Sequence, residues 1–281
     1  MTNSATAMKN TFVPTDGEYV TIGNIMVKVD SPLNTDYFKQ FKRRESQLMQ
    51  ILKSGLSDAT DQFVEGAWLL IEDYPDEANG YHNIMMAMGN YERAGASGKA
   101  RALADKMITS SVPEEYKLWS RGFLNRLDLL GKSVALQFTA MDGRKVDSGR
   151  MRGKVVLADF WATRCGPCVA ELSRVKSAWE QYHVQGLEVI GISCDTAKSD
   201  LEKYVKRHEI FWPQYFGGQR RTENKFTVEF GINGIPHMFL LDKKGFLRFD
   251  NVRAGDKFHP KNDTTSFEEK ISTLLAEPAK F

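Results

Sequence analysis

Two cysteines stand two residues apart at a point where a strand should turn into a helix. Cys165 and Cys168 enclose Gly166 and Pro167, and the apolar run 154–158 precedes them. The N–H groups and the dipole of a helix's first turn stabilise negative charge, so we expect the Cys165 thiol to ionise easily. Cys168 lies one helical turn later, close enough to attack a mixed disulfide formed at Cys165. The spacing therefore predicts a redox-active dithiol.

The residues around the cysteines predict the elements that position them. The run 154–158 is apolar without alternation, as in a strand that is buried on both faces of a parallel sheet. Gly166 lets the backbone of a partner come close, and Pro167 suits the first turn of a helix, where its missing N–H costs nothing. After the motif, apolar residues recur at helical spacing along one face: Leu172, Val175, Trp179 and Tyr182.

Half of a zinc site is the alternative interpretation of the same spacing. Zinc would need two further soft ligands, but the only other cysteine is Cys194 and the five histidines show no ligand spacing. The sequence therefore predicts no metal site.

The composition is that of a globular protein long enough for two domains. The chain has 281 residues, of which 42% are hydrophobic and 26% charged. Its 38 basic and 36 acidic residues leave a net charge of +2, so neither a nucleic-acid nor a membrane surface is indicated. Three cysteines are too few for a disulfide framework.

The first 30 residues do not have the pattern of a signal peptide. They lack a basic segment followed by an apolar run, and no part of the chain approaches the ~20 apolar residues of a membrane span. We therefore expect either a cytosolic protein or a sequence given in a mature or trimmed form.

The pattern divides the chain into three parts. Residues 1–33 form an irregular arm with a small hairpin around Gly23 and Asn24. Residues 34–131 form an all-α helical-hairpin domain, and residues 132–281 form a domain of alternating strands and helices.

Five amphipathic helices with short connections are expected in the second part. No 34-residue period repeats cleanly, so tetratricopeptide repeats are not assigned. Met85, Met86 and Met88 can be core residues or an adaptable binding surface, and the helical spacing favours the core. The expected apolar faces include Phe41 and Ile51, Phe63 and Leu70, Ile84 and Met88, Leu103 and Met107, and Trp119 and Phe123.

The third part predicts an α/β sandwich around a mixed sheet. A hairpin turn at Asp242 to Gly245 joins its last two strands, and a second hairpin opens the domain. The expected strands are 135–139, 144–146, 154–160, 187–193, 237–241 and 246–249, and the expected helices are 166–184, 197–208, 222–229 and 266–276.

Two motifs in this part carry a resemblance to a known family. The first is the run 160–168, Phe-Trp-Ala-Thr-Arg-Cys-Gly-Pro-Cys, and the second is the run 230–236, Phe-Gly-Ile-Asn-Gly-Ile-Pro. Residues from 131 to 281 resemble the thioredoxin superfamily, in particular its TlpA/ResA-like thiol–disulfide oxidoreductases. Residues 1–130 are not covered by the resemblance.

The resemblance implies a thioredoxin-like fold and a site made from both motifs. It places a cis proline, Pro236, across from the nucleophile Cys165, and it pairs the backbone of Ile235 with the substrate peptide. Cys168 then resolves the mixed disulfide. The side chains or backbone expected to meet the substrate are Ile235, Pro236, Trp161, Arg164, Gly166 and Pro167.

The implied activity is reduction of disulfides in protein partners. It needs no cofactor beyond the dithiol of Cys165 and Cys168, and it needs an upstream thiol reductant. A protein partner can also bind the helical domain, whereas no nucleic acid or metal is expected. The resemblance favours an extracytoplasmic location, periplasmic or membrane-associated, although the missing signal peptide favours the cytosol.

Two acidic residues near the cysteines are candidates for proton transfer. Asp159 lies where thioredoxins keep a buried carboxylate, which has a raised pKa and can take the proton of Cys168. Glu171 matches a glutamate that TlpA/ResA-like proteins carry, but Ser173 replaces the proline that usually follows. An exposed first-turn glutamate is the other interpretation of Glu171.

Three further residues need an interpretation: two differ from the residue usual in the family, and one is a cysteine outside the two motifs. Arg164 replaces a usual tryptophan and can either favour the Cys165 thiolate or be a solvated surface arginine. His237 follows the cis proline, where threonine is usual. Cys194 is expected at the carboxyl edge of the sheet, where it can join the site or be a buried, inert thiol.

Two other functions compete with the reductase. A peroxidase of the peroxiredoxin type is suggested by the strand 189–193, but the Pro-x-x-x-Thr-x-x-Cys motif of that family is absent. The second is a scaffold, in which the helical domain binds a partner and the redox domain is secondary.

Overall fold

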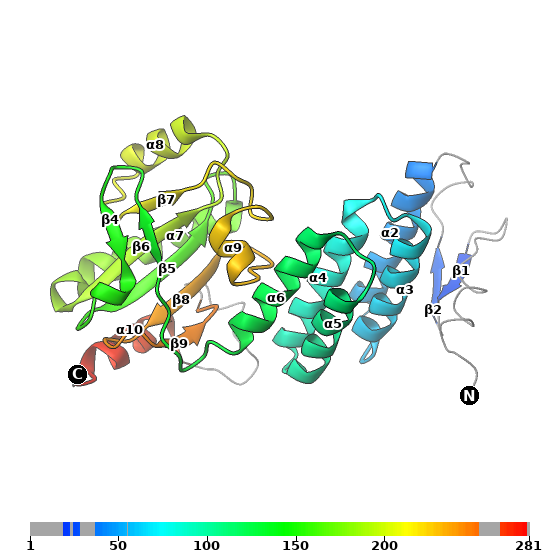
Figure 1. The fold of residues 1–281 in the computed structure, drawn as a ribbon, viewed down its shortest axis with the longest axis horizontal. Helices are drawn as coiled ribbons and strands as arrows, with labels where there is room; N and C mark the ends of the chain where they lie inside the picture. The colour runs from blue at the N-terminus through cyan, green and yellow to red at the C-terminus, as the bar shows by residue number, and fades with distance from the viewer. Residues whose placement is uncertain (1–18, 23–24, 29–36, 55, 253–264, 280–281) are drawn as a thin grey trace. The chain divides into compact units, whose positions relative to one another are not determined.

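A computed structural model describes residues 19–22, 25–28, 37–54, 56–252 and 265–279 (Figure 1). Its contacts divide the chain into two compact units, Met1–Lys106 and Met107–Phe281. This division falls earlier in the chain than the expected boundary at 131. Among the described residues, no helix has the length and apolar character needed to cross a membrane.

The first unit is a short hairpin followed by helices. β1 (Tyr19–Ile22) pairs antiparallel with β2 (Ile25–Lys28), as expected, while the turn between them and residues 1–18 of the expected arm lie outside the described residues. The helices are α2 (Tyr37–Lys53), α3 (Ala59–Asp73), α4 (Ala78–Arg93) and α5 (Ser97–Thr109), which continues across the boundary.

Helical spacing gives this unit its core. The predicted apolar faces are buried at Phe41, Phe63, Ile84 and Met88. Met85 is buried too, which favours the core interpretation of the methionine cluster.

A mixed sheet of five strands, in the order β7-β6-β5-β8-β9, forms the centre of the second unit. β5, β6 and β7 run parallel, and β8 and β9 are antiparallel to their neighbours. The strands are β5 (Val155–Trp161), β6 (Leu187–Ser193), β7 (Gln214–Phe216), β8 (His237–Leu241) and β9 (Leu247–Asp250). This arrangement confirms the predicted α/β sandwich around a mixed sheet, in a thioredoxin-like form.

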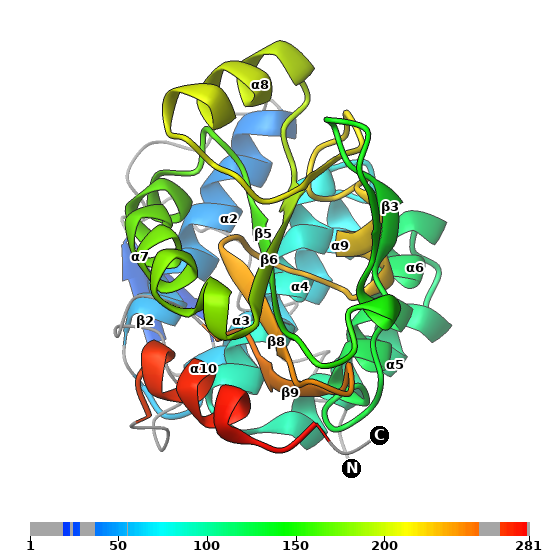
Figure 2. The ribbon, with the colours of Figure 1, turned by 90° about the vertical axis from the view of Figure 1, so that its left-hand side faces the viewer.

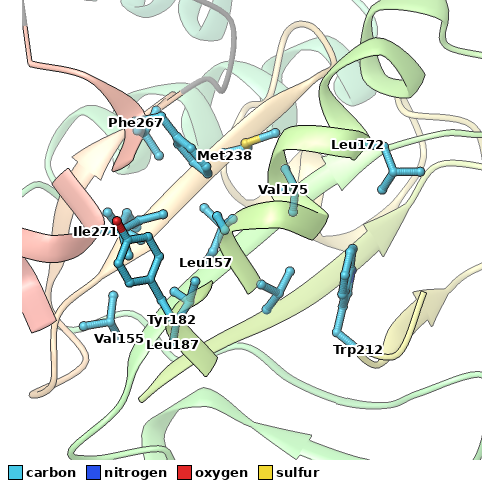
Figure 3. Packing of buried hydrophobic residues seen from close by; sticks show 14 of the residues in the cluster. Val155, Leu157, Leu172, Val175, Tyr182, Leu187, Trp212, Met238, Phe267 and Ile271 are labelled. Atoms are coloured by element: carbon cyan, nitrogen blue, oxygen red, sulfur yellow. The ribbon is translucent and has the colours of Figure 1, made fainter. Parts of the chain in front are cut away.

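Two layers cover this sheet (Figure 2). α7 (Gly166–Tyr182) and α10 (Phe267–Ala276) lie on one face, where Val155 and Leu157 of the sheet pack against Val175 and Ile271 (Figure 3). The other face is covered by the hairpin β3–β4 (Gln137–Thr139 and Lys145–Asp147) and α9 (Lys225–Glu229), with Phe226 and Val146 in its core. Both faces of the central strands are thus apolar, which explains their lack of alternation.

The remaining elements connect these layers. α8 (Lys198–Arg207) joins β6 to β7, and the 3-10 helices η1 (Ser148–Arg150) and η2 (His183–Gln185) follow β4 and α7. α6 (Glu114–Leu127) belongs to the second unit and packs against α9. α6 was expected as the last helix of the helical-hairpin domain, but it is part of the second unit.

Strand directions bring three segments to one edge of the sheet. β5 and β6 end there at Trp161 and Ser193, and β8 begins there because His237 pairs with Phe160 in antiparallel register. The loops that follow or precede these ends contain Cys165, Cys194 and Pro236.

Candidate dithiol site at the carboxyl edge of the sheet

Cys165 and Cys168 form a disulfide bond at the start of α7. Cys165 is the N-cap residue, and its sulfur accepts a hydrogen bond from the Cys168 N–H with an N to S distance of 3.3 Å. Cys168 is 4% exposed, whereas Cys165 is partly exposed and Gly166 and Pro167 are open to solvent. The sulfur that a partner can reach is therefore that of Cys165.

The second motif faces this sulfur. The Ile235–Pro236 peptide bond is cis, as the resemblance implies. The carbonyl oxygen of Ile235 lies 3.7 Å from Cys165 Sγ. Ile235 is partly exposed and Pro236 is buried, so the residue before the proline forms a ledge beside the disulfide. We call Ile235 and Pro236 the cis-proline ledge.

A buried carboxyl group lies on the strand that leads to the cysteines. Asp159 is 5% exposed, and its Oδ1 has no hydrogen-bond partner among the described residues. Burial, with a smaller contribution from the negative charge of Glu171, raises the pKa of Asp159 to about 8. Glu171 is buried on the first turns of α7, so its exposed-surface interpretation is wrong. Both acidic residues therefore belong to the interior behind the disulfide.

Arg164 is turned towards the end of β6. Its side chain is 55% exposed, and Nη2 donates a hydrogen bond of 3.0 Å to the carbonyl oxygen of Cys194. Nη1 lies 3.8 Å from a carboxylate oxygen of Asp195. The guanidinium charge is thus partly offset by a neighbouring carboxylate, which weakens its effect on Cys165.

Asp195 organises the loop between β5 and the cysteines. Its buried carboxylate accepts hydrogen bonds from the backbone N–H and the hydroxyl of Thr163, at 3.0 and 2.7 Å, and from the hydroxyl of Ser193 at 2.9 Å. Charge-assisted bonds of this kind are among the stronger hydrogen bonds in proteins. Asp195 therefore fixes the loop that carries Arg164 and Cys165.

Cys194 is buried beside this loop. Burial raises the pKa of its thiol to about 12, so it stays protonated near neutral pH and is a poor nucleophile. This agrees with the interpretation of Cys194 as an inert core thiol. The described residues contain no group of histidine, cysteine or acidic side chains able to hold a metal ion.

Trp161 is held inside the domain. Its side chain is buried, and its Nε1–H donates a hydrogen bond of 2.9 Å to Gln214 on β7. A side chain at Gly191 would collide with Gln214. The indole nitrogen is therefore bonded inward, and the expected contact of Trp161 with a substrate stays a prediction.

His237 is the first residue of β8 and is buried directly after the cis proline. Its ring contacts Asp250 on β9. Sequence reasoning missed Asp250 and also Asp195 and Gln214. Asp195 could have been found, because it follows a buried strand at the carboxyl edge of the sheet. Gln214 and Asp250 lie on strand ends with no pattern that marks them.

Comparisons with known proteins agree with this geometry. Residues 131–250 match the model of the AhpC/TSA family. The thiol-disulfide oxidoreductase ResA of Geobacillus thermodenitrificans is 28% identical over 132 residues, which are 46% of this chain and 74% of that protein. ResA of Bacillus cereus (strain ZK / E33L) is 26% identical over 107 residues, or 38% of this chain and 60% of that protein.

A solved structure covers the same part of the chain. The thioredoxin domain of a thiol-disulfide oxidoreductase from Bacteroides vulgatus is 22% identical, with a TM-score of 0.44, and covers 52% of this chain and 97% of that one. The AhpC/TSA match falls on the unit that contains the disulfide and the cis-proline ledge. Through this C-terminal part, the chain resembles thiol-disulfide oxidoreductases and is related to ResA.

Proposed function

We propose that the protein reduces disulfide bonds in other proteins with the dithiol of Cys165 and Cys168. The observation that carries the proposal is the position of Cys165, at the start of α7 and 3.7 Å from the ledge carbonyl of Ile235. A helix N-terminus favours the thiolate, and an exposed backbone carbonyl can pair with an extended substrate peptide.

In the first step the Cys165 thiolate attacks one sulfur of the partner's disulfide. A new S–S bond forms between Cys165 and the partner, and the second partner sulfur leaves as a thiolate. Cys168 is buried behind Cys165 and does not compete for the partner.

In the second step Cys168 attacks Cys165 Sγ. Its thiol proton passes to the carboxylate form of Asp159, and the remaining partner sulfur leaves as a thiolate that water protonates. The partner has then gained two electrons, and Cys165 and Cys168 form the disulfide seen in the structure. A pKa of about 8 suits Asp159 for this transfer, because a group titrating near ambient pH can both accept and release a proton. The nearby negative charge of Glu171 supports the raised pKa.

An upstream thiol reductant returns the two electrons and regenerates the dithiol. The cycle requires no cofactor besides the two cysteines. An extracytoplasmic location is part of this proposal, because it rests on the resemblance to TlpA/ResA-like proteins. The helical unit is proposed to bind a protein partner.

The test is reduction of a protein disulfide by the purified full chain. Insulin reduction with dithiothreitol as electron source should require both cysteines and should stop in Cys165→Ser. The Cys168→Ser variant should accumulate mixed disulfides on Cys165, which can be isolated under non-reducing conditions. Failure of wild-type protein to accelerate insulin reduction would overturn the proposal, and rapid peroxide consumption in a parallel assay would favour the peroxidase instead.

A further inference from the structure

The residue that follows the cis proline belongs to a buried polar network. His237 is 7% exposed, and its Nε2 lies 2.7 Å from Oδ1 of Asp250 on β9. The other carboxylate oxygen, Oδ2, accepts a hydrogen bond from Nη1 of Arg126 on α6, which is 3% exposed. We call these three side chains the Arg126–Asp250–His237 network.

The charge state of Asp250 fixes the direction of both hydrogen bonds. Burial alone raises the pKa of Asp250, but the charges and hydrogen bonds of Arg126 and His237 outweigh it and hold the pKa at about 2. The carboxylate is therefore ionised at neutral pH and can only accept hydrogen bonds. It follows that Nε2 of His237 carries a proton and that the ring cannot turn over without losing this bond.

Aromatic rings hold His237 from the other sides. Its ring lies 6.1 Å from that of Phe160 and 5.4 Å from that of Phe239, measured between centroids and in edge-to-face geometry. Phe160 is also its antiparallel partner on β5. The imidazole is thus fixed by packing and by one charged hydrogen bond.

The helix that supplies Arg126 also braces the loop before the ledge. Gly122 of α6 faces the carbonyl oxygen of Val228, and Gly231 faces the backbone of Phe123, so closely that a Cβ at either glycine would collide. Gly231 also has a positive φ of 54°, which favours glycine. The loop leading to Pro236 therefore rests directly on the α6 backbone.

We propose that the Arg126–Asp250–His237 network is a positioning device that holds the cis-proline ledge at the geometry required by a protein disulfide, with α6 as its anchor. The inference rests on the proposed reductase function and adds residues to it. None of the three side chains need touch the substrate; His237 acts through the backbone of Pro236 and Ile235, to which it is joined.

The position of the ledge matters for large substrates more than for small ones. A protein disulfide must align its peptide backbone with Ile235 while its sulfur meets Cys165, whereas a small aromatic disulfide needs only the sulfur contact. A misplacement of about 1 Å can cost up to ~100-fold in rate when alignment is required. Loss of the network should therefore change substrate preference and not the chemistry of the thiols.

The experiment compares two substrates in the full-length protein. His237→Leu keeps the bulk of the ring and leaves the Arg126–Asp250 pair intact, while His237→Gln restores an N–H donor near the position of Nε2. His208→Leu is the matched control, since His208 is exposed at the end of α8. Each protein is assayed with insulin and with 5,5′-dithiobis(2-nitrobenzoate), and its dithiol potential is measured against glutathione.

We expect His237→Leu to lower kcat/KM for insulin about tenfold, mainly through KM, and to change the small-disulfide rate by less than about twofold. His237→Gln should recover most of the loss, and the dithiol potential should stay unchanged in both. Asp250→Asn should show the same preferential loss with insulin, because it removes the charged acceptor of the His237 Nε2–H.

Provided that the wild-type protein reduces insulin, two results would overturn the inference. One is an equal loss with both disulfides, which would mean general damage, and the other is full insulin activity in His237→Leu. Amide hydrogen exchange over residues 231–241 gives a readout without catalysis: it should quicken in His237→Leu but not in His237→Gln or His208→Leu. Wild-type protein that reduces neither disulfide would instead contradict the proposed function.

Discussion

Asp159 is buried and titrates near neutral pH, so the attack of Cys168 on the mixed disulfide should depend on pH through this carboxyl group. Asp159→Asn keeps the size of the side chain but cannot accept the Cys168 proton, so resolution of the mixed disulfide should slow by roughly 100-fold. The rise of the wild-type rate as pH increases towards 8, the value about which Asp159 titrates, should be missing from the variant. Single-turnover release of a partner thiol from the mixed disulfide measures this step alone.

The same substitution should stabilise the fold at alkaline pH. The pKa of Asp159 rises from 3.8 to about 8 on folding, so the wild-type protein loses stability as pH increases through this window. Asp159→Asn should therefore unfold at higher denaturant concentration than wild type at about pH 9, by more than ~1 kcal/mol, and alike at about pH 3. If wild type and Asp159→Asn were equally stable at both pH values, folding would not raise the pKa of Asp159.

Arg164 should contribute little to the reactivity of Cys165. Its guanidinium bonds the carbonyl oxygen of Cys194 and lies near Asp195, and an exposed ion pair is worth at most ~1 kcal/mol. Arg164→Leu should shift the pKa of the Cys165 thiol by less than about half a unit, measured by thiolate absorbance in reduced protein at low and high salt. A shift above about one unit that salt abolishes would restore the electrostatic role suggested by the sequence.

At the scale of elements, α6 is a helix that the sequence predicts but whose packing partner it does not. Its helical pattern is plain, with Trp119 and Phe123 buried as expected, but periodicity says nothing about which neighbour a helix packs on. Arg126 and Asp250 are 124 residues apart, and no local signal connects them. The expected boundary at 131 therefore separated α6 from the domain that it supports.

A fragment comparison tests this position of α6. Residues 132–281 lack α6 and leave the buried Asp250 without Arg126, whose removal should cost roughly 3–5 kcal/mol. Residues 107–281 keep both. Denaturant unfolding should show the longer fragment near the stability of the same unit in the full chain, and the shorter one much weaker or insoluble. Equal stability of the two fragments would mean that α6 only rests on the domain.

Point substitutions in the full chain test the same packing without truncation. Gly122→Ala places a methyl group against the carbonyl oxygen of Val228, so it should destabilise the second unit by roughly 1–3 kcal/mol. Gly98→Ala on α5 is the matched control, because nothing lies within 4 Å of its Cβ position, and it should be neutral or slightly stabilising. Similar effects of both substitutions on thermal unfolding would argue against a tight contact between α6 and α9.

Other elements show why part of the fold was predictable. The strands β5, β6 and β8 were expected within one or two residues, because their apolar runs are long and bounded by turns. β7 was missed: it has three residues, contains the buried polar Gln214, and stands between Pro213 and Gly217. Likewise Cys165, Cys168 and Pro236 were placed through their motifs, whereas the inward turn of Trp161 depends on Gln214, which only the tertiary structure brings close.

At the scale of the whole molecule, the near balance of charge limits how partners can be attracted. With 38 basic and 36 acidic residues, no strong overall field can steer a charged substrate. The insulin reduction rate should therefore change less than about threefold between about 50 and 500 mM salt. A steep fall with salt would instead reveal a local charged docking surface, and repeating the titration with Arg164→Leu would show whether that residue belongs to it.

The thiol of Cys194 is buried and protonated beside the loop that carries Cys165. Its modification can therefore report how often the native domain opens locally. In a Cys165→Ser, Cys168→Ser background, a thiol reagent can modify the chain only when the carboxyl edge of the sheet opens. The rate of that modification, followed by mass spectrometry over hours, measures how often the native domain opens in the absence of denaturant.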